Sequence, residues 1–270
     1  MSEAALETLL RRDRVIVGAA LAALTVAAWL HLLHLASAMS DMAMPDMPAV
    51  PGIAMAMPAL HAWSWVEVGV LVVMWGVMMI AMMTPAAAPM ILMFSTIRRR
   101  RTAEGRPAVP TAIFILGYLA VWTIYSVVAA LGQAGLHSAA MLSPAMAATS
   151  PLLAGGLLVA AGVFQWTPLK RACLAACRSP LSFLMTAWRE GRGGAFVMGL
   201  RHGLYCLGFC WALMALLFVA GVMNLLWVAV IAVAVLVEKV VPRGDLVGRF
   251  AGVALVVAGV LLVARAVAGY

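Results

Sequence analysis

Long runs of hydrophobic residues, separated by short polar segments, extend along the whole chain. A helix of about 20 apolar residues crosses the hydrocarbon core of a bilayer, whereas the strands of a membrane barrel alternate apolar and polar positions. The continuous runs therefore predict an all-α fold, a polytopic transmembrane helix bundle of about seven spans. The predicted spans cover residues 15–38, 63–94, 112–131, 152–169, 195–220, 223–241 and 246–267.

Prolines modify two of these runs. Pro85 and Pro89 fall inside the second run, which is longer than one span needs, and they predict a kink, a break or a tilt there. Pro168 lies near the end of the fourth run, which either ends there or continues beyond it. No small-residue cleavage site follows the first run at a suitable distance, so we interpret that run as a true helix and not as a signal peptide.

The composition excludes a water-soluble globule. Hydrophobic residues make up 66% of the chain and charged residues 10%, whereas soluble domains average roughly 45–50% and 25%. The lipid bilayer is therefore an expected partner. The net charge of +8 does not indicate nucleic-acid binding, because in a membrane protein the distribution of basic residues over the loops matters more than their sum.

Basic residues occur in alternate loops. They lie before the first run and after the second, fourth and sixth, while the loops 37–62, 132–151 and 221–222 contain no Lys or Arg. The positive-inside rule then places the amino terminus in the cytoplasm and the carboxy terminus outside. The predicted segments are a cytoplasmic head (1–14), a first transmembrane helix (15–38), a Met-rich outer loop (39–62) and a six-helix membrane bundle (63–270) with a cytoplasmic Cys-bearing loop at 168–194.

The outer loop and its neighbours carry soft metal ligands. Thioethers suit Cu(I), and, unlike thiols, they form no disulfides in an oxidising compartment. We therefore predict an outer copper-capture site; the alternative is a flexible apolar linker that covers the membrane surface. The predicted ligands are His31 and His34, which share a helix face, with Met42, Met44, Met55, Met57 and His61.

A ladder of methionines lies in the second run: Met78, Met79, Met82 and Met83. They form two i, i+4 pairs, and packing against lipid or other helices is the interpretation that we favour. The alternative is a soft-ligand ladder that ends at the proline-broken turn. Broken helices are tolerated where the backbone lines a cavity or is buried in protein.

The four cysteines occur as two pairs with the same spacing, Cys173 with Cys177 and Cys206 with Cys210. Disulfides are the weakest interpretation, because cytosolic thiols stay reduced and i, i+4 cysteines are poorly placed for a mutual bridge. An inner metal site formed by these thiols and His202 competes with the alternative that the cysteines pack as small hydrophobes. Neighbouring basic residues favour the thiolate form.

The two cysteine pairs can meet only if the segment after Pro168 turns back under the bundle. Four polar residues in or near the spans are expected to support an inner site, because such residues are costly in a membrane: Gln165, Lys170, Glu238 and Lys239. Glu238 and Lys239 either pair with each other or with Arg201, or form a solvated helix end. Gly199 and Gly203 form a small-x3-small step that predicts close helix contact.

Four stretches, "WGVMMIAMMTPAAAPM", "FQWTPLKRACLAACRSP", "GLRHGLYCLGFCWALM" and "VEK", resemble in order the signature blocks of a bacterial family of predicted metal-binding integral membrane proteins. The resemblance covers roughly residues 63 to 265 and implies a multi-pass protein of the bacterial inner (cytoplasmic) membrane that handles metal, with its outer loop in the periplasm. The matching positions are Met82, Met83, Pro85, Gln165, Pro168, Lys170, Cys173, Cys177, Arg178, His202, Cys206, Cys210, Trp211, Met214, Glu238 and Lys239.

The leading hypothesis is a metal-binding integral membrane protein that captures, stores or delivers copper, with zinc or iron as alternative metals. A non-catalytic accessory subunit of a larger membrane enzyme complex is one alternative, and a membrane redox protein that uses the Cys pairs or a bound metal or haem centre is another. The chain has no evident nucleophile–base pair, phosphate loop or carboxylate dyad, so we do not expect an enzyme. Expected partners besides lipid are a metallochaperone or other membrane subunits, and no nucleic acid.

Overall fold

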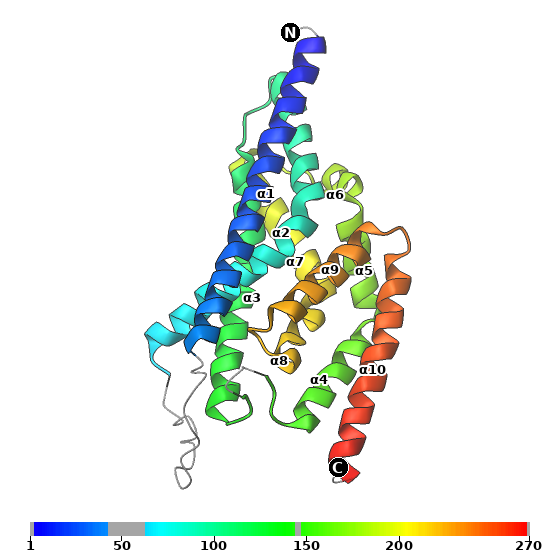
Figure 1. The fold of residues 1–270 in the computed structure, drawn as a ribbon. Helices are drawn as coiled ribbons and strands as arrows, with labels where there is room; N and C mark the ends of the chain where they lie inside the picture. Colours follow the sequence, from blue (N-terminus) through cyan, green and yellow to red (C-terminus); the bar gives the residue numbers. More distant parts are fainter. Residues whose placement is uncertain (1–2, 43–62, 144–146, 269–270) are drawn as a thin grey trace.

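The computed structural model describes residues 3–42, 63–143 and 147–268, and this part of the chain is almost entirely helical. The all-α prediction is therefore confirmed. The helices pack into an elongated bundle, with the start of α1 and the end of α10 at opposite ends (Figure 1). In chain order they are α1 (Glu3–Met42), α2 (Trp65–Ala103), α3 (Thr111–Ser138), α4 (Pro151–Phe164), α5 (Pro168–Arg178), α6 (Pro180–Ala187), α7 (Gly191–Ala215), α8 (Leu217–Ala220), α9 (Leu225–Val240) and α10 (Gly244–Ala268).

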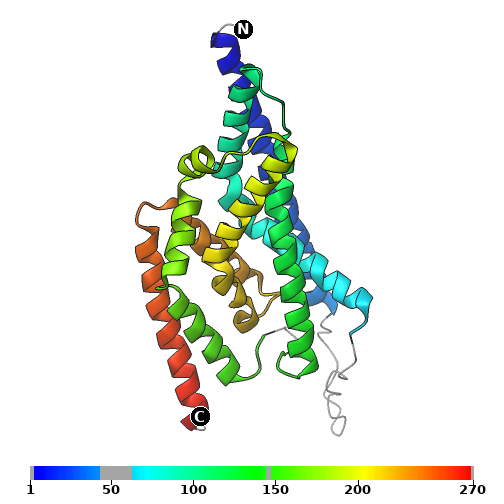
Figure 2. The same cartoon turned by 180° about the vertical axis from the view of Figure 1, so that it is seen from behind.

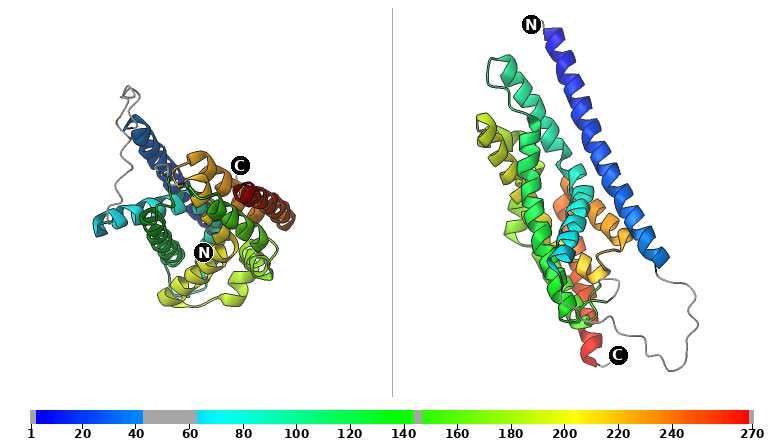
Figure 3. Two further views of the ribbon diagram at one scale, coloured as in Figure 1. Left: turned by 90° about the horizontal axis from the view of Figure 1, so that it is seen from below. Right: turned by 90° about the vertical axis from the view of Figure 1, so that its left-hand side faces the viewer.

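Five stretches of helix are long and apolar enough to cross a membrane: much of α1, then α2, α3, α7 continued by α8, and α10. α4 and α5 pass the same test together as one bent span, so the described residues provide five spans, or six. The sequence predicted about seven, and the difference arises at α9. Its 16 residues fall short of the about 20 that cross the hydrocarbon core. The long apolar helices are compatible with a membrane protein, in which α1 lies along one side of the bundle (Figure 3).

Glycines allow the closest contact between α3 and α7. A Cβ atom on Gly117 would lie 2.2 Å from the carbonyl oxygen of Phe196, and one on Gly199 would lie 2.0 Å from that of Phe114. In a membrane, lipid tails remove the hydrophobic drive for helices to associate, so association relies on close packing of this kind. The close contact predicted at Gly199 is confirmed.

α4 and α10 meet in the same way. A Cβ atom on Gly155 would lie 2.8 Å from the carbonyl oxygen of Gly259, and one on Gly162 would lie 2.8 Å from that of Gly252. These two contacts are about two helical turns apart along both helices. They join the fourth helix of the chain to the last one.

α2 is one continuous but bent helix (Figure 1), and Pro85 lies inside it. Proline has no N–H, so the carbonyl of Ala81, four residues earlier, loses its helical partner. The indole N–H of Trp29 on α1 donates to that oxygen at 3.2 Å. The hydroxyl of Tyr118 on α3 donates to the nearby Met83 carbonyl at 3.3 Å. The predicted kink is present. Side chains from two neighbouring helices donate hydrogen bonds to the backbone there, and inside a membrane every backbone polar group needs such a partner.

A second bend, of 63°, separates α4 from α5. The side chain of Thr167 caps α5 by accepting from the Lys170 backbone N–H, and Pro168 occupies the first turn, where its missing N–H costs nothing. Pro168 thus starts a new helix and does not simply end the previous one. The bend turns α5 against α7 (Figure 2). The segment 168–194, predicted as a loop, therefore contains α5, α6 and the start of α7.

The substitution Gly199→Val is expected to lower the free energy of unfolding by about 1–3 kcal/mol or more, because the added side chain would overlap a backbone oxygen of α3. Thermal unfolding of the purified protein in detergent measures the change. Gly132→Ala is the control, because it also replaces a glycine inside a helix. A Cβ atom at this position meets nothing within 4 Å. Equal Tm values for the two variants would contradict the close contact.

Candidate metal site

Three of the four cysteines come together inside the bundle from two different helices. The thiol of Cys177 on α5 lies within interaction range of that of Cys206 on α7, and Cys210 lies one turn further along α7. All three side chains are fully buried, and all four cysteines of the chain carry free thiols. The bend before α5 therefore turns this segment back against the bundle, which is the condition for the two pairs to meet.

Neighbouring groups extend this cluster. The thiol of Cys210 donates to the carbonyl oxygen of Cys206 at 3.0 Å and lies 4.0 Å from the thioether sulfur of Met83, beside the bend in α2. The hydroxyl of Tyr118 lies 3.4 Å from the Cys206 sulfur. We call Cys177, Cys206, Cys210 and Met83 the sulfur cluster. It joins α2, α5 and α7 at one place.

Cys173 lies one turn before Cys177 and packs differently. A Cβ atom on Gly208 of α7 would lie 2.7 Å from the Cys173 sulfur. The thiol therefore sits directly against the backbone of α7, in space that only a glycine leaves open. Packing as a small hydrophobe accounts for this contact.

His202 lies one turn before Cys206 on α7 and is fully buried. Its ring stacks on those of Tyr118 and Phe114, with centroids 5.6 and 6.3 Å apart. Neither ring nitrogen has a hydrogen-bond partner within the described part of the chain. A buried polar group without a partner is costly, and imidazole is also a good ligand for copper and zinc. His202 is therefore an additional donor beside the sulfur cluster.

Buried charged side chains lie on α5 and α9. Lys170 forms an ion pair with Glu238 at 2.6 Å, and its ammonium group also donates to Gln165. Lys239 is buried as well, and its Nζ atom has no hydrogen-bond partner among the described residues. The sequence predicted that Glu238 pairs with Lys239 or Arg201, or ends the helix in solvent; its ion-pair partner is instead Lys170. The bend brings α5 alongside α9, and spacing along the chain could not indicate that.

The thiols and the thioether of the sulfur cluster favour a soft metal ion with a low coordination number. Within the described residues, no three His, Cys, Asp or Glu side chains form a ready metal site. A structural Zn(II) site takes about four ligands in a tetrahedron. The sulfur cluster instead offers a thiol pair with another thiol and a thioether next to it, and soft sulfur ligands select Cu(I). The residues present therefore fit Cu(I) better than Zn(II).

The predicted outer ligands are in a different position. His31 and His34 lie on α1 with exposed side chains. The other members of that set fall outside the part of the chain that the structure describes: Met44, Met55, Met57, His61 and the side chain of Met42. The outer copper-capture site stays a prediction.

The methionine ladder of α2 lies in the core. Met78, Met79 and Met82 are buried among hydrophobic side chains, which supports the packing interpretation. Met82 also lines an apolar cavity of about 150 Å³ with Trp29. Met83 is the ladder residue that contacts the sulfur cluster.

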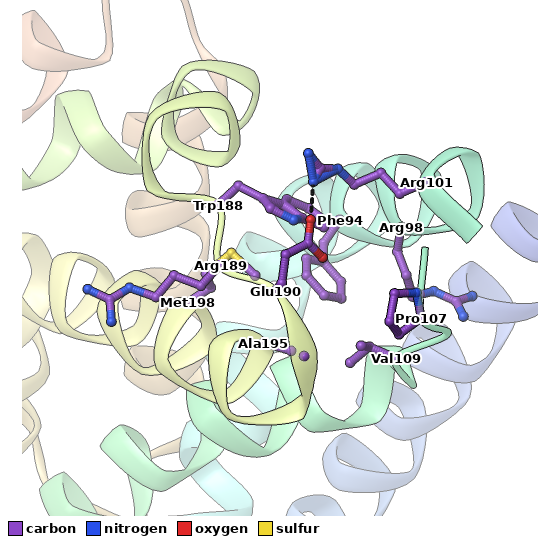
Figure 4. A pocket seen from close by; sticks show the side chains of 11 residues that line it. Phe94, Arg98, Arg101, Pro107, Val109, Trp188, Arg189, Glu190, Ala195 and Met198 are labelled. Carbon is purple, nitrogen blue, oxygen red and sulfur yellow. Dashed lines mark hydrogen bonds and ion pairs between the residues drawn. The ribbon is translucent and has the colours of Figure 1, made fainter. Parts of the chain in front are cut away.

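A small pocket lies near the basic end of α2, where this helix meets the connection between α6 and α7 (Figure 4). Arg101 forms an ion pair with Glu190 at 2.6 Å, and its guanidinium carbon lies 4.7 Å from the ring centroid of Trp188. The space is about 10 Å³, enough for a single water molecule. These contacts fasten α2 to the start of α7, and they leave no room for a larger ligand.

Comparison with known proteins links the chain to one family. Residues 72–262 match a family model described as PpoB2, copper chaperone. No curated protein and no solved structure matches the chain. The matched range contains all four cysteines, the α2 bend and the buried charges of α5 and α9.

The Lys170–Glu238 pair makes the fold sensitive to single charge removal. Lys170→Met is expected to destabilise the protein by about 3–5 kcal/mol, because Glu238 is then buried without a cation. The double variant Lys170→Met with Glu238→Met removes both charges and is expected to recover most of that loss. Thermal unfolding in detergent compares the two. A double variant as unstable as the single one would contradict this role of charge.

Proposed function

The chain belongs to the PpoB2 copper-chaperone family, and from this premise we propose that it is a membrane-embedded copper-handling protein that holds Cu(I) as its cargo between Cys177 and Cys206. The observation that carries the proposal is that these two thiols come from different helices, are fully buried and lie within interaction range of each other. Soft thiolate and thioether donors select Cu(I). The pair, with Cys210 and Met83 beside it, supplies them.

Binding at this pair exchanges protons for metal. The thiolate is the form that ligates a metal, so each thiol that binds Cu(I) loses its proton to solvent or to an accepting group. Burial keeps bulk water away from the bound ion. A bundle interior is therefore suited to holding Cu(I) without releasing it into solution.

Cys210 and Met83 give the ion a route between donors. The Met83 thioether lies 4.0 Å from the Cys210 thiol, which in turn contacts Cys206. A soft ion can pass between neighbouring sulfurs by exchanging one ligand at a time, because an incoming donor is within reach before the outgoing one leaves. This arrangement supports delivery of copper in preference to permanent storage.

The family assignment also favours copper handling over the two alternatives from the sequence. A packing role for the cysteines in an accessory subunit accounts for Cys173, but not for the neighbouring thiols of Cys177 and Cys206 beside an unpaired imidazole. A redox protein would need a bound centre or a reacting thiol pair. The family description favours transport of the metal itself.

We also propose the orientation of the chain in a bacterial inner membrane, with the start of α1 in the cytoplasm and the end of α10 in the periplasm. Arginines at the end of α2 and around the α6–α7 connection support it through the positive-inside rule. The opposite positions of the two chain ends fit an odd number of crossings (Figure 1). In this proposal α9 completes the seventh crossing as a short helix.

Cys177→Ser and Cys206→Ser are each expected to abolish stable Cu(I) binding, because each removes one member of the thiol pair. Elemental analysis of protein purified from copper-supplied cells, followed by competition with a Cu(I)-selective chelator, measures the loss. Cys173→Ser is the matched control and is expected to retain the metal, since Cys173 packs against Gly208. Copper content unchanged by both pair substitutions would overturn the proposed function.

Reporter fusions check the orientation. A reporter that is active only in the periplasm is expected to be inactive when fused after residue 104, beyond α2, and active when fused after residue 139, beyond α3. The reason is the cluster of arginines that ends α2 and the absence of Lys and Arg from 132–151. The reverse pattern of activities would show that the chain is inserted the other way round.

A further inference from the structure

Lys239 is a buried cation that the fold leaves without a partner. It lies in the last turn of α9, 7% exposed, and its Nζ atom has no hydrogen-bond acceptor among residues 3–42, 63–143 and 147–268. The adjacent Glu238 is already ion-paired with Lys170. Lysine is almost never buried unless it is paired, because its charge loses the hydration that water provides. The position of Lys239 therefore requires an explanation.

The end of α9 is fastened to α5. The guanidinium of Arg178, the last residue of α5, donates to the carbonyl oxygens of Val241 and Pro242 at 2.5 and 2.7 Å. The guanidinium of Arg178 therefore lies at the carboxyl end of α9, where the helix dipole favours a cation. They hold the last turn of α9 beside the helix that carries Cys177.

α9 packs against α5 and α7, the helices that carry the cysteines, so Lys239 is buried near the sulfur cluster. Its charge is within interaction range of the thiols of Cys177, Cys206 and Cys210 and of the imidazole of His202. The charges of Lys170 and Glu238 cancel each other in their ion pair. Lys239 therefore contributes a net positive charge to the region around the cluster.

The effect of the Lys239 charge depends on the net charge of the thiolate–metal complex, which differs between monovalent and divalent ions. Two thiolates around a monovalent ion leave one net negative charge, which a buried ammonium group neutralises. Two thiolates around a divalent ion leave no net charge, so the same ammonium group stays uncompensated. At short range inside a protein, such a difference is large compared with thermal energy.

We infer that Lys239 is the fixed counter-charge of the thiolate pair and that it makes the site select monovalent Cu(I) over divalent ions such as Zn(II). This inference rests on the proposed function, because it assumes that Cys177 and Cys206 bind the metal. Lys239 does not touch the ion. It acts through the thiolates, by stabilising the complex that carries one negative charge.

The test measures Cu(I) and Zn(II) affinities of the full-length protein in detergent by chelator competition. Lys239→Met replaces the ammonium group with a neutral side chain of similar length. Its Cu(I) affinity is expected to fall by about 10- to 100-fold, while its Zn(II) affinity changes by less than about threefold, so the preference for Cu(I) narrows. The metal-free variant is expected to unfold at a higher temperature than the original protein, because an unpaired buried charge has been removed.

Two control variants separate charge from shape. Lys239→Arg keeps the positive charge and is expected to retain most of the preference for Cu(I). The double variant Lys170→Met with Glu238→Met also removes a buried lysine, but it leaves the net charge of the region unchanged, and the original preference is expected to persist.

The outcomes distinguish the inference from the proposed function. If the original protein binds no Cu(I), the proposed function fails, and this inference fails with it. If the original protein binds Cu(I) and Lys239→Met keeps the same ratio of Cu(I) to Zn(II) affinity, only the counter-charge role is overturned. A Lys239→Arg variant that behaves like Lys239→Met would also overturn it, since charge would then not be the property that matters.

Discussion

The capped turn at Thr167 and Pro168 is the constraint on which the rest of the bundle interior depends. A threonine cap and a proline in the first turn start a new helix at an angle to α4. The bend lays α5 against α7, and this places Cys177 beside Cys206. The same rotation brings the ammonium group of Lys170 to the carboxylate on α9. A straight continuation of α4 would have separated both pairs.

The interior that results combines soft donors with buried charge. Thioether and thiol sulfurs are nearly apolar, so a cluster of them fits among hydrophobic side chains at little cost. Charge enters such a site only with the metal, when thiols give up protons. The ion pair between α5 and α9 neutralises Lys170 and Glu238, and carbonyl oxygens bind Arg178, so that Lys239 is the buried charge left without a partner among the described residues. The copper-chaperone description of the family agrees with these soft donors, which suit the Cu(I) cargo that we propose.

Much of the fold could be predicted from the sequence, and less of the site. Long apolar runs are sufficient to predict helices, Pro85 is sufficient to predict a bend in α2, and Gly199 indicates a close helix contact, because each is a local property of the chain. The partner of Glu238 could not be found in this way, and neither could the glycine that faces Cys173. Both depend on the direction in which α5 turns, which is set by packing between helices far apart in sequence. The structure has five or six candidate spans where the sequence predicted about seven, because α9 has only 16 residues.

The glycine contacts between α4 and α10 have a consequence for the order in which the protein is assembled. α4 is made well before α10, and five of the described helices lie between them in the chain. α4, and α5 beyond the bend, therefore lack a lasting neighbour on that side until the last helix has entered the membrane. The packing of α4 against α10 is therefore completed late in assembly.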